Sequence, residues 1–201
     1  MKLYFSPGAC SLSPHIVLRE IGQKFDLAKV DLGSKKTDAG EDYTKVNPKG
    51  YVPALEIKDG EVLTEGPAIV QYLADNAKAT NILPAPGTMG RYRAMEWLNF
   101  ITSEIHKAFG SLFGKTLNED ARKAAIDRLS SRFGYLDQHL TKSKYLLGDA
   151  FSVADAYLWT CLRWAKGLGI DLDKWTHLSD YVRRIGERPS VRDAMKAEGL
   201  A

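Results

Sequence analysis

The spacing of apolar residues predicts two kinds of structure along the chain, with a change near residue 80. The first part alternates short strand-like runs with stretches that have helical periodicity. The expected strands are Leu3–Phe5, Phe25–Asp31, Tyr51–Ile57 and Glu61–Thr64, and the expected helices are Ser11–Gly22 and Pro67–Ala77. The turn Lys58-Asp59-Gly60 is a strong hairpin signal, and Lys35–Tyr43 is a polar loop. The predicted order is therefore βαβ, then a ββ hairpin, then α.

The second part is predicted to be entirely helical. Residues 80–89 are rich in proline and turn formers, so we place a linker at about 80–87. Helices are expected over Thr88–Phe113, Asn118–Thr141, from Ser152 onward, Leu178–Gly186 and Ser190–Ala197. The third of these opens on Ser152-Val153-Ala154-Asp155, an acidic capping box. We expect an α/β domain over residues 1–79 and an all-α helical bundle over residues 88–201.

Composition narrows the function classes without naming a ligand. The 201 residues are 44% hydrophobic and 26% charged, with a formal net charge of +3. Basic residues form no cluster or aromatic-interleaved stripe, so nucleic acid is not expected as a partner. No apolar run is long enough to span a membrane, and no signal peptide precedes the first strand. We expect a cytoplasmic protein, in which its two cysteines, Cys10 and Cys161, stay reduced.

Cys10 is the first candidate for chemistry. It lies between the first predicted strand and the first predicted helix, after the turn Ser6-Pro7-Gly8. Unpaired N–H groups at a helix start stabilise a thiolate, so this position predicts a lowered thiol pKa. The alternative is a buried structural thiol, which is how we interpret Cys161 in its apolar helical stretch.

Three further features could surround a ligand. Val52-Pro53 precedes a strand, where a cis peptide bond would leave backbone free to pair with an extended peptide; an ordinary trans proline is the alternative. Glu65-Gly66 begins a helix whose N-terminus could receive a carboxylate, or could simply be a cap. Asn99, Ser103 and His106 share one face of the long helix at i, i+4 and i+7. That face could serve a cleft, a partner or solvent, and His106 could act on a thiolate or be structural.

Together these motifs resemble one family over essentially the whole chain. The N-terminal half is similar to a thioredoxin-like domain with one cysteine in place of a C-x-x-C, and the half with the Ser152–Asp155 box is similar to the C-terminal domain of cytosolic glutathione transferases. Four stretches resemble the bacterial beta class specifically: residues 2–12, 47–55, 63–66 and 104–107. The resemblance implies a thioredoxin-like glutathione-binding domain followed by a helical domain. It also implies a homodimer that uses glutathione as co-substrate, with no metal.

The resemblance also implies roles for individual residues. Cys10 would contact the glutathione sulfur, and Val52, before cis Pro53, would pair with its cysteinyl part. Glu65 and Gly66 would hold the γ-glutamyl end, while Lys35 would reach the glycyl carboxylate, with Lys36 as the alternative lysine. The residues expected to complete the site, some of them across the dimer interface, are Asn99, Ser103, Glu104 and His106. Cys10 and His106 are the expected catalytic residues.

Two departures from the family pattern affect these expectations. Many members carry serine where this chain has Gly66, so one hydrogen bond to the γ-glutamyl carboxylate is lost. Position 5 is Phe and cannot donate to a thiolate, and Tyr4 should point to the opposite face of its strand. Stabilisation of the thiolate is therefore expected from the region of Cys10 and Ser11 and from His106.

Three functions remain open from the sequence. The leading one is conjugation of glutathione to an electrophile, such as a halogenated aromatic compound, in detoxification. The second is thiol transfer or reductive dehalogenation through a mixed disulfide between Cys10 and glutathione. The third is a non-enzymatic binder of hydrophobic ligands. Helical aromatic residues such as Phe109, Phe113 and Trp164 are candidates for the electrophile pocket, although aromatic residues at this spacing are more often core.

Overall fold

The computed structural model describes residues 1–58, 60–114 and 117–200, and it divides the chain into two compact units. The first unit contains residues 1–80 together with residues 188–201, and the second contains residues 81–187. The prediction assigned every residue after the linker to the helical domain, whereas the last 14 residues belong to the first unit. The reason is that the last helix, α9 (Pro189–Ala197), packs on α1 (Leu12–Glu20).

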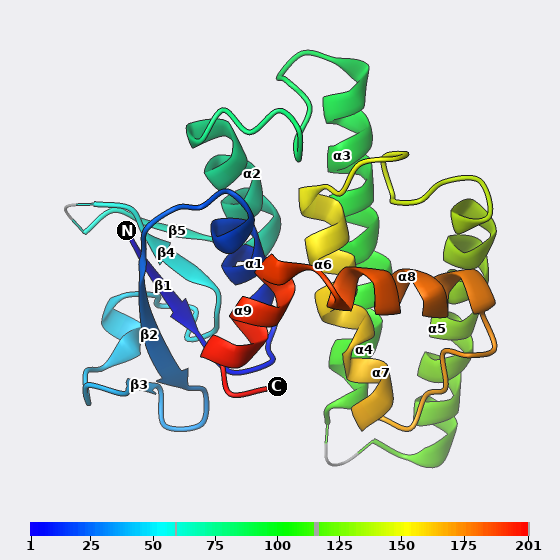
Figure 1. Cartoon of the computed structure of the whole chain (residues 1–201). Helices are drawn as coiled ribbons and strands as arrows, with labels where there is room; N and C mark the ends of the chain where they lie inside the picture. Colours follow the sequence, from blue (N-terminus) through cyan, green and yellow to red (C-terminus); the bar gives the residue numbers. More distant parts are fainter. Residues whose placement is uncertain (59, 115–116, 201) are drawn as a thin grey trace. The chain divides into compact units, whose positions relative to one another are not determined.

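The first unit contains a five-stranded mixed sheet in the order β3-β2-β1-β4-β5 (Figure 1). The strands are β1 (Lys2–Phe5), β2 (Asp26–Asp31), β3 (Lys36–Thr37), β4 (Ala54–Glu56) and β5 (Val62–Thr64). β1 and β2 are parallel, as a crossover through α1 requires, and the other pairs are antiparallel. The predicted βαβ-ββα order is confirmed. The predicted hairpin joins β4 to β5, although Asp59 of its turn lies outside the described residues.

The stretch expected to be a polar loop contains two short elements instead. β3 pairs with β2, and the 3₁₀-helix η1 (Tyr43–Lys45) follows, with the Asp42 side chain accepting a hydrogen bond from the Thr44 N–H. Both elements are too short to show a periodicity in the sequence. β3 depends on pairing with β2, whereas η1 is closed by local hydrogen bonds such as those from the Lys45 and Val46 N–H groups to the carbonyls of Asp42 and Tyr43.

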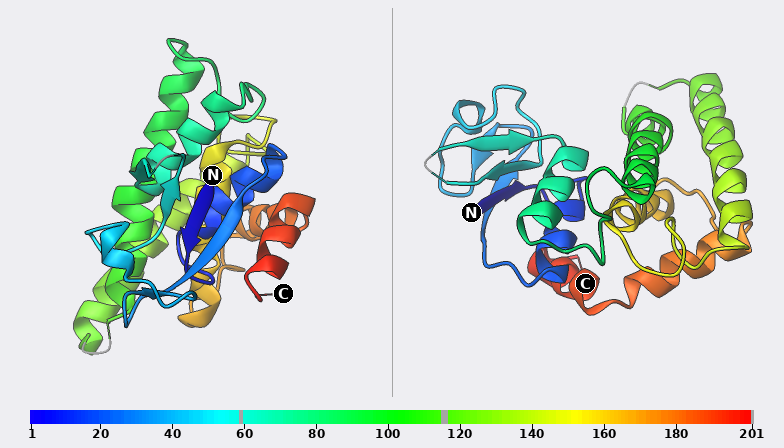
Figure 2. Two further views of the ribbon diagram at one scale, coloured as in Figure 1. Left: turned by 90° about the vertical axis from the view of Figure 1, so that its left-hand side faces the viewer. Right: turned by 90° about the horizontal axis from the view of Figure 1, so that it is seen from above.

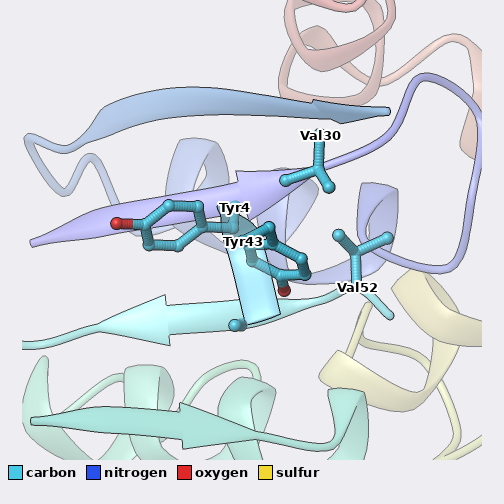
Figure 3. Close-up of a cluster of buried hydrophobic side chains, with 5 residues drawn as sticks. Tyr4, Val30, Tyr43 and Val52 are labelled. Atoms are coloured by element: carbon cyan, nitrogen blue, oxygen red, sulfur yellow. The ribbon is translucent and has the colours of Figure 1, made fainter. Parts of the chain in front are cut away.

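The two faces of the sheet are covered differently. α1, α9 and α2 (Gly66–Asn76) lie on one face (Figure 2). Residues of β1 alternate between the faces: Phe5 lies near the ring of His15 in α1, while Tyr4 lies against Tyr43 of η1. Figure 3 shows this second cluster, which also includes Val30 and Val52 and lies on the face away from the helices. The prediction that Tyr4 points away from the Phe5 face is confirmed.

The second unit is helical, as predicted. Its helices are α3 (Met89–Phe100), η2 (Ile101–His106), α4 (Lys107–Leu112), α5 (Glu119–Leu140), α6 (Val153–Leu162), α7 (Trp164–Gly167) and α8 (Thr176–Gly186). The first three run on from one another, within the range predicted for one long helix, but η2 is a π-helix. The side chains of Thr88 and Asn118 cap α3 and α5. Among the described residues, no helix is long and apolar enough to cross a membrane.

The predicted capping box at the start of α6 is present and belongs to a larger buried network. The carboxylate of Asp155, which is fully buried, accepts hydrogen bonds from the Ser152 N–H and hydroxyl at 2.8 and 2.5 Å. It also accepts from the Leu146 N–H and the Tyr181 hydroxyl, each at 2.9 Å. Burial raises the pKa of Asp155, and these hydrogen bonds oppose the increase. The box therefore fixes the loop before α6 and part of α8 as well as the helix start.

Candidate active site

Cys10 lies in the loop between β1 and α1, as predicted. The hydroxyl of Ser11 closes this loop because it accepts from the Ser6 N–H at 3.2 Å and donates to the Ser6 carbonyl at 3.3 Å. The Cys10 thiol donates to the carbonyl oxygen of Val52 at 3.2 Å. The structure therefore brings together two of the residues that the sequence singled out separately.

The predicted lowering of the Cys10 thiol pKa is wrong. Burial raises the pKa of Cys10 to about 11, and the negative charge of Glu65 adds to the increase. The N–H groups of Cys10 and Ser11 act in the predicted direction, but they do not outweigh the loss of solvation. Cys10 is therefore a protonated hydrogen-bond donor at neutral pH.

The peptide group between Tyr51 and Val52 is held by two residues to which the sequence analysis assigned no role. The Tyr43 hydroxyl and the Asn47 side-chain amide both donate to the carbonyl of Tyr51, at 3.0 and 2.6 Å. Burial raises the pKa of Tyr43 to about 12, so the hydroxyl keeps the proton that it donates. The Val52–Pro53 peptide bond is cis, as predicted. Asn47 is the first residue of the 47–55 stretch, and its Asn-Pro turn could have indicated a structural role for Asn47.

Glu65 and Gly66 lie at the start of α2, next to Pro53. Glu65 adopts a left-handed backbone conformation with φ of 70°, which is uncommon outside glycine, and its carbonyl accepts from the Ala68 and Ile69 N–H groups. A Cβ atom at Gly66 would lie 3.9 Å from Cγ of Pro53, an ordinary contact distance. Cys10, Val52, Pro53, Gly66 and Glu65 are therefore consecutive neighbours in the first unit, with Val52 and Pro53 buried between the others.

Two exposed side chains next to Glu65 were missed from the sequence. The Lys49 amino group lies 2.5 Å from Oε1 of Glu65 and also donates to the Thr64 hydroxyl at 3.0 Å. The Tyr51 hydroxyl lies 3.5 Å from the same carboxylate oxygen. An ammonium group of a ligand would therefore compete with Lys49 for the Glu65 carboxylate.

Lys35 lies beside the segment that precedes Val52. Its amino group donates to the carbonyl of Gly50 at 2.7 Å, and its alkyl chain passes close to the Cα of Gly50, which has φ of 70°. The backbone of Lys36 pairs instead with Asp31 in the sheet and with Asp42. Of the two lysines, Lys35 is the one that the structure links to the 47–53 segment.

The remaining predicted residues belong to the second unit and surround the π-helix. Within η2 the Lys107 N–H bonds to the carbonyl of Thr102, the i→i+5 pattern that defines such a helix. The side chains of Thr102 and Ser103 donate to the carbonyls of Leu98 and Asn99, at 2.8 and 3.0 Å. The wider turn changes the simple i, i+4, i+7 face that the sequence predicted for Asn99, Ser103 and His106. Asn99 and Ser103 are exposed.

Glu104 and His106 each have a partner on another helix. The carboxylate of Glu104 pairs with the guanidinium of Arg132 in α5 at 2.7 and 2.8 Å. Nδ1 of His106 lies 2.6 Å from the hydroxyl of Tyr157 in α6, and the His106 ring is 5.1 Å from the ring of Trp164. The sequence analysis assigned no role to Tyr157, which lies in the same apolar stretch as Cys161. Its ring is buried, and its hydroxyl fixes the orientation of His106.

Aromatic residues continue from Trp164 along α4. The Trp164 ring lies 5.7 Å from Phe109 and 5.5 Å from Phe113, both edge-on, and Phe113 is 53% exposed. His106 therefore lies at one end of an aromatic cluster that is partly open to solvent. Such a surface suits an apolar or aromatic ligand.

Comparisons with known proteins identify the family. Residues 8–76 match the model of the glutathione S-transferase N-terminal domain, and residues 100–189 match that of the glutathione S-transferase C-terminal domain. Glutathione S-transferase GstA of Escherichia coli O157:H7 is 44% identical over the full length of both chains. A sphingomonad glutathione S-transferase solved with glutathione is 48% identical, with a TM-score of 0.96 and full coverage of both chains. A beta-class glutathione S-transferase of Sphingomonas chungbukensis is 47% identical, also with a TM-score of 0.96 and full coverage.

The chain belongs to the glutathione S-transferase family. Within that family, its similarity to the bacterial beta class is confirmed, as are the predicted fold class and the assignment as a transferase.

Proposed function

We propose that this glutathione transferase joins the sulfur of glutathione to an electrophilic carbon, with halogenated aromatic compounds as the acceptor class. The observation that carries the proposal is the surface formed by Cys10, Val52, Gly66 and Glu65, which offers a thiol donor, a polar backbone and a carboxylate in series. A γ-glutamyl peptide with a central thiol presents the complementary groups in the same order. The glutathione-bound relative supports glutathione as the ligand.

Each group in this surface has a defined task. Glu65 pairs with the α-ammonium group of glutathione, and the start of α2 at Gly66 faces its α-carboxylate. The Val52 backbone pairs with the cysteinyl residue, and Lys35 meets the glycyl carboxylate. The Cys10 thiol turns from the Val52 carbonyl to the glutathione sulfur, and its donated hydrogen bond favours the thiolate form of the ligand.

The reaction is a nucleophilic substitution. The bound thiol releases its proton to solvent water, the thiolate sulfur forms a bond to the electrophilic carbon, and the carbon–halogen bond breaks so that halide leaves. His106, oriented by Tyr157, and the partly exposed rings of Trp164 and Phe113 contact the electrophile, while Phe109 is buried behind them. The raised pKa of Cys10 favours this role for Cys10 over attack by the Cys10 sulfur itself.

A second copy of the chain completes the proposed enzyme. The second unit exposes apolar side chains on α3 and α5, including Tyr92 at 56%, Met89 at 69% and Tyr135 at 53%. Between these helices lies an open groove of ≈ 820 Å³ lined in part by Trp97 and Tyr135. Exposed apolar surface of this kind supports a homodimer, in which Asn99, Ser103 and Glu104 act toward the partner's glutathione. Sedimentation equilibrium of the wild type and of Tyr92→Glu tests this, and a monomeric wild type would contradict it.

A cytoplasmic location and a role in detoxification remain predictions.

The chemical proposal is tested by conjugation of a chlorodinitrobenzene with two variants of Cys10. Cys10→Ser keeps a hydroxyl donor, and Cys10→Ala removes it. If Cys10 only donates a hydrogen bond, Cys10→Ser retains most activity and Cys10→Ala loses about tenfold, the effect of one hydrogen bond to a charged group. If the reaction passes through a mixed disulfide with Cys10, both variants are inactive, and the conjugation mechanism is overturned.

A further inference from the structure

The carboxylate of Glu198 is buried at the C-terminal end of α9, where it does not stabilise the helix. Glu198 follows the last residue of α9, and its side chain is 0% exposed. A negative charge at the C-terminal end of a helix opposes the helix dipole, and burial of a carboxylate is costly unless it is hydrogen-bonded. Its presence there requires partners elsewhere in the first unit.

Those partners lie at the other end of the sequence. Oε1 of Glu198 is 2.8 Å from Nδ1 of His15, whose side chain is also 0% exposed, and Oε2 accepts from the Gly8 N–H at 2.9 Å. Nε of Arg19 donates to Nε2 of His15 at 3.4 Å. Because arginine can only donate, this contact makes Nε2 the acceptor and places the ring proton on Nδ1, where it points at Glu198. The His15 ring is enclosed by aromatic rings, including that of Phe25.

Gly8 belongs to the loop that carries Cys10. It has φ of 72°, a left-handed conformation that suits glycine, and it lies two residues before Cys10. Inside the loop, Ser6 and Ser11 bond to each other. Glu198 therefore supplies a contact from outside the loop, across 190 residues of sequence.

We propose that Glu198 is a positioning residue for Cys10: its carboxylate, oriented by His15, holds the Gly8 N–H and so fixes the loop that presents the Cys10 thiol. The effect on turnover rests on the proposed function, whereas the effect on the loop does not. The C-terminal segment thus sets the geometry of the N-terminal active-site loop. This gives a reason for α9 to pack in the first unit rather than with the other helices of the C-terminal half.

Three chains test the proposal beside the wild type. Glu198→Ala removes both acceptors, while Glu198→Gln keeps one oxygen for Gly8. Glu20→Ala is the matched control, because Glu20 ties the opposite end of the same helix pair: its carboxylate bonds to Arg188 and, at 2.5 Å, to the Ser190 hydroxyl. Each chain is measured by amide hydrogen exchange over residues 6–12, by alkylation of Cys10 with iodoacetamide, and by kcat and KM for glutathione.

In Glu198→Ala, exchange in the loop and alkylation of Cys10 at neutral pH both rise by about tenfold, the size of one lost hydrogen bond to a charged group. Alkylation rises because a looser loop buries the thiol less. At the same time kcat falls by about as much, with KM for glutathione little changed, because Glu65 and Gly66 are untouched. Glu20→Ala keeps loop exchange, alkylation and kcat near the wild-type values. Glu198→Gln falls between the wild type and Glu198→Ala, because its single amide oxygen can accept from Gly8 or from His15 but not from both.

A residue that only stabilises the fold would not raise alkylation while lowering kcat per folded chain. The proposal is overturned if Glu198→Ala leaves loop exchange and alkylation unchanged, or if Glu20→Ala reproduces its effects. If Glu198→Ala does not fold, Glu198→Gln decides, since loop exchange and alkylation equal to the wild type in that variant overturn the proposal. If the wild type shows no conjugation activity but Glu198→Ala still exchanges and alkylates faster than the wild type, the positioning role stands and the proposed reaction is rejected.

Discussion

The protonated state of Cys10 makes a quantitative prediction about its reactivity. The perturbation is a change of pH during alkylation with iodoacetamide, which reacts with the thiolate. With a pKa of about 11, the Cys10 thiolate is roughly one part in 3,000 at pH 7.5, whereas a free cysteine of pKa about 8.5 is roughly one part in ten. The folded protein should therefore react about 300-fold more slowly than free cysteine at this pH.

The sign of the pH effect follows from the same comparison. Because the pKa is raised, the alkylation rate should increase about tenfold per pH unit from pH 6 to beyond pH 9, without a plateau in that range. Mass spectrometry of the modified peptide gives the rate, and Cys10→Ser measures any background from Cys161, which is buried. A plateau near pH 7 would show that the N–H groups of the loop outweigh burial, and it would refute the reasoning.

Three other substitutions test separate parts of the structure. Gly66→Ser fits because a Cβ there meets only Pro53 at 3.9 Å, and its hydroxyl should tighten glutathione binding by about tenfold in calorimetry; weaker binding would contradict this. Tyr157→Phe removes the 2.6 Å contact to His106 and should lower kcat by about fivefold to tenfold with KM for glutathione unchanged, while an unchanged kcat would exclude a role for the pair. Asp155→Ala leaves several buried donors unpaired and should lower the free energy of unfolding by about 3–5 kcal/mol in urea titrations, whereas a loss below about 1 kcal/mol would refute the buried-network account.

Much of the fold could be predicted because local patterns carry it. The short apolar runs, the hairpin turn, the capping box at Ser152 and the linker near residue 80 each depend on neighbouring residues. β3 and α7 are too short to show a period. The return of α9 to the first unit depends on contacts between residues far apart in the sequence, such as Glu198 with Gly8 across 190 positions, which no local pattern encodes.

The site was predicted less completely, for physical reasons that differ between residues. Cys10 was found from its position at a strand–helix turn, but its pKa depends on burial, which the sequence does not show. The π-helix at Ile101–His106 has no periodic signal, since its residues also fit an α-helix. Lys49 was missed because its ion pair with Glu65 forms only in the folded chain. Tyr157 was missed because it lies in an apolar stretch, where nothing in the sequence distinguishes a hydroxyl that bonds to His106.

The most direct test of the account is calorimetric titration of glutathione onto the wild type and Glu65→Gln. We predict one glutathione per chain for the wild type, and binding weaker by about tenfold or more for Glu65→Gln, which loses the carboxylate that meets the ligand ammonium. No binding to the wild type, or equal affinity in the two proteins, would contradict the site formed by Cys10, Val52, Gly66 and Glu65.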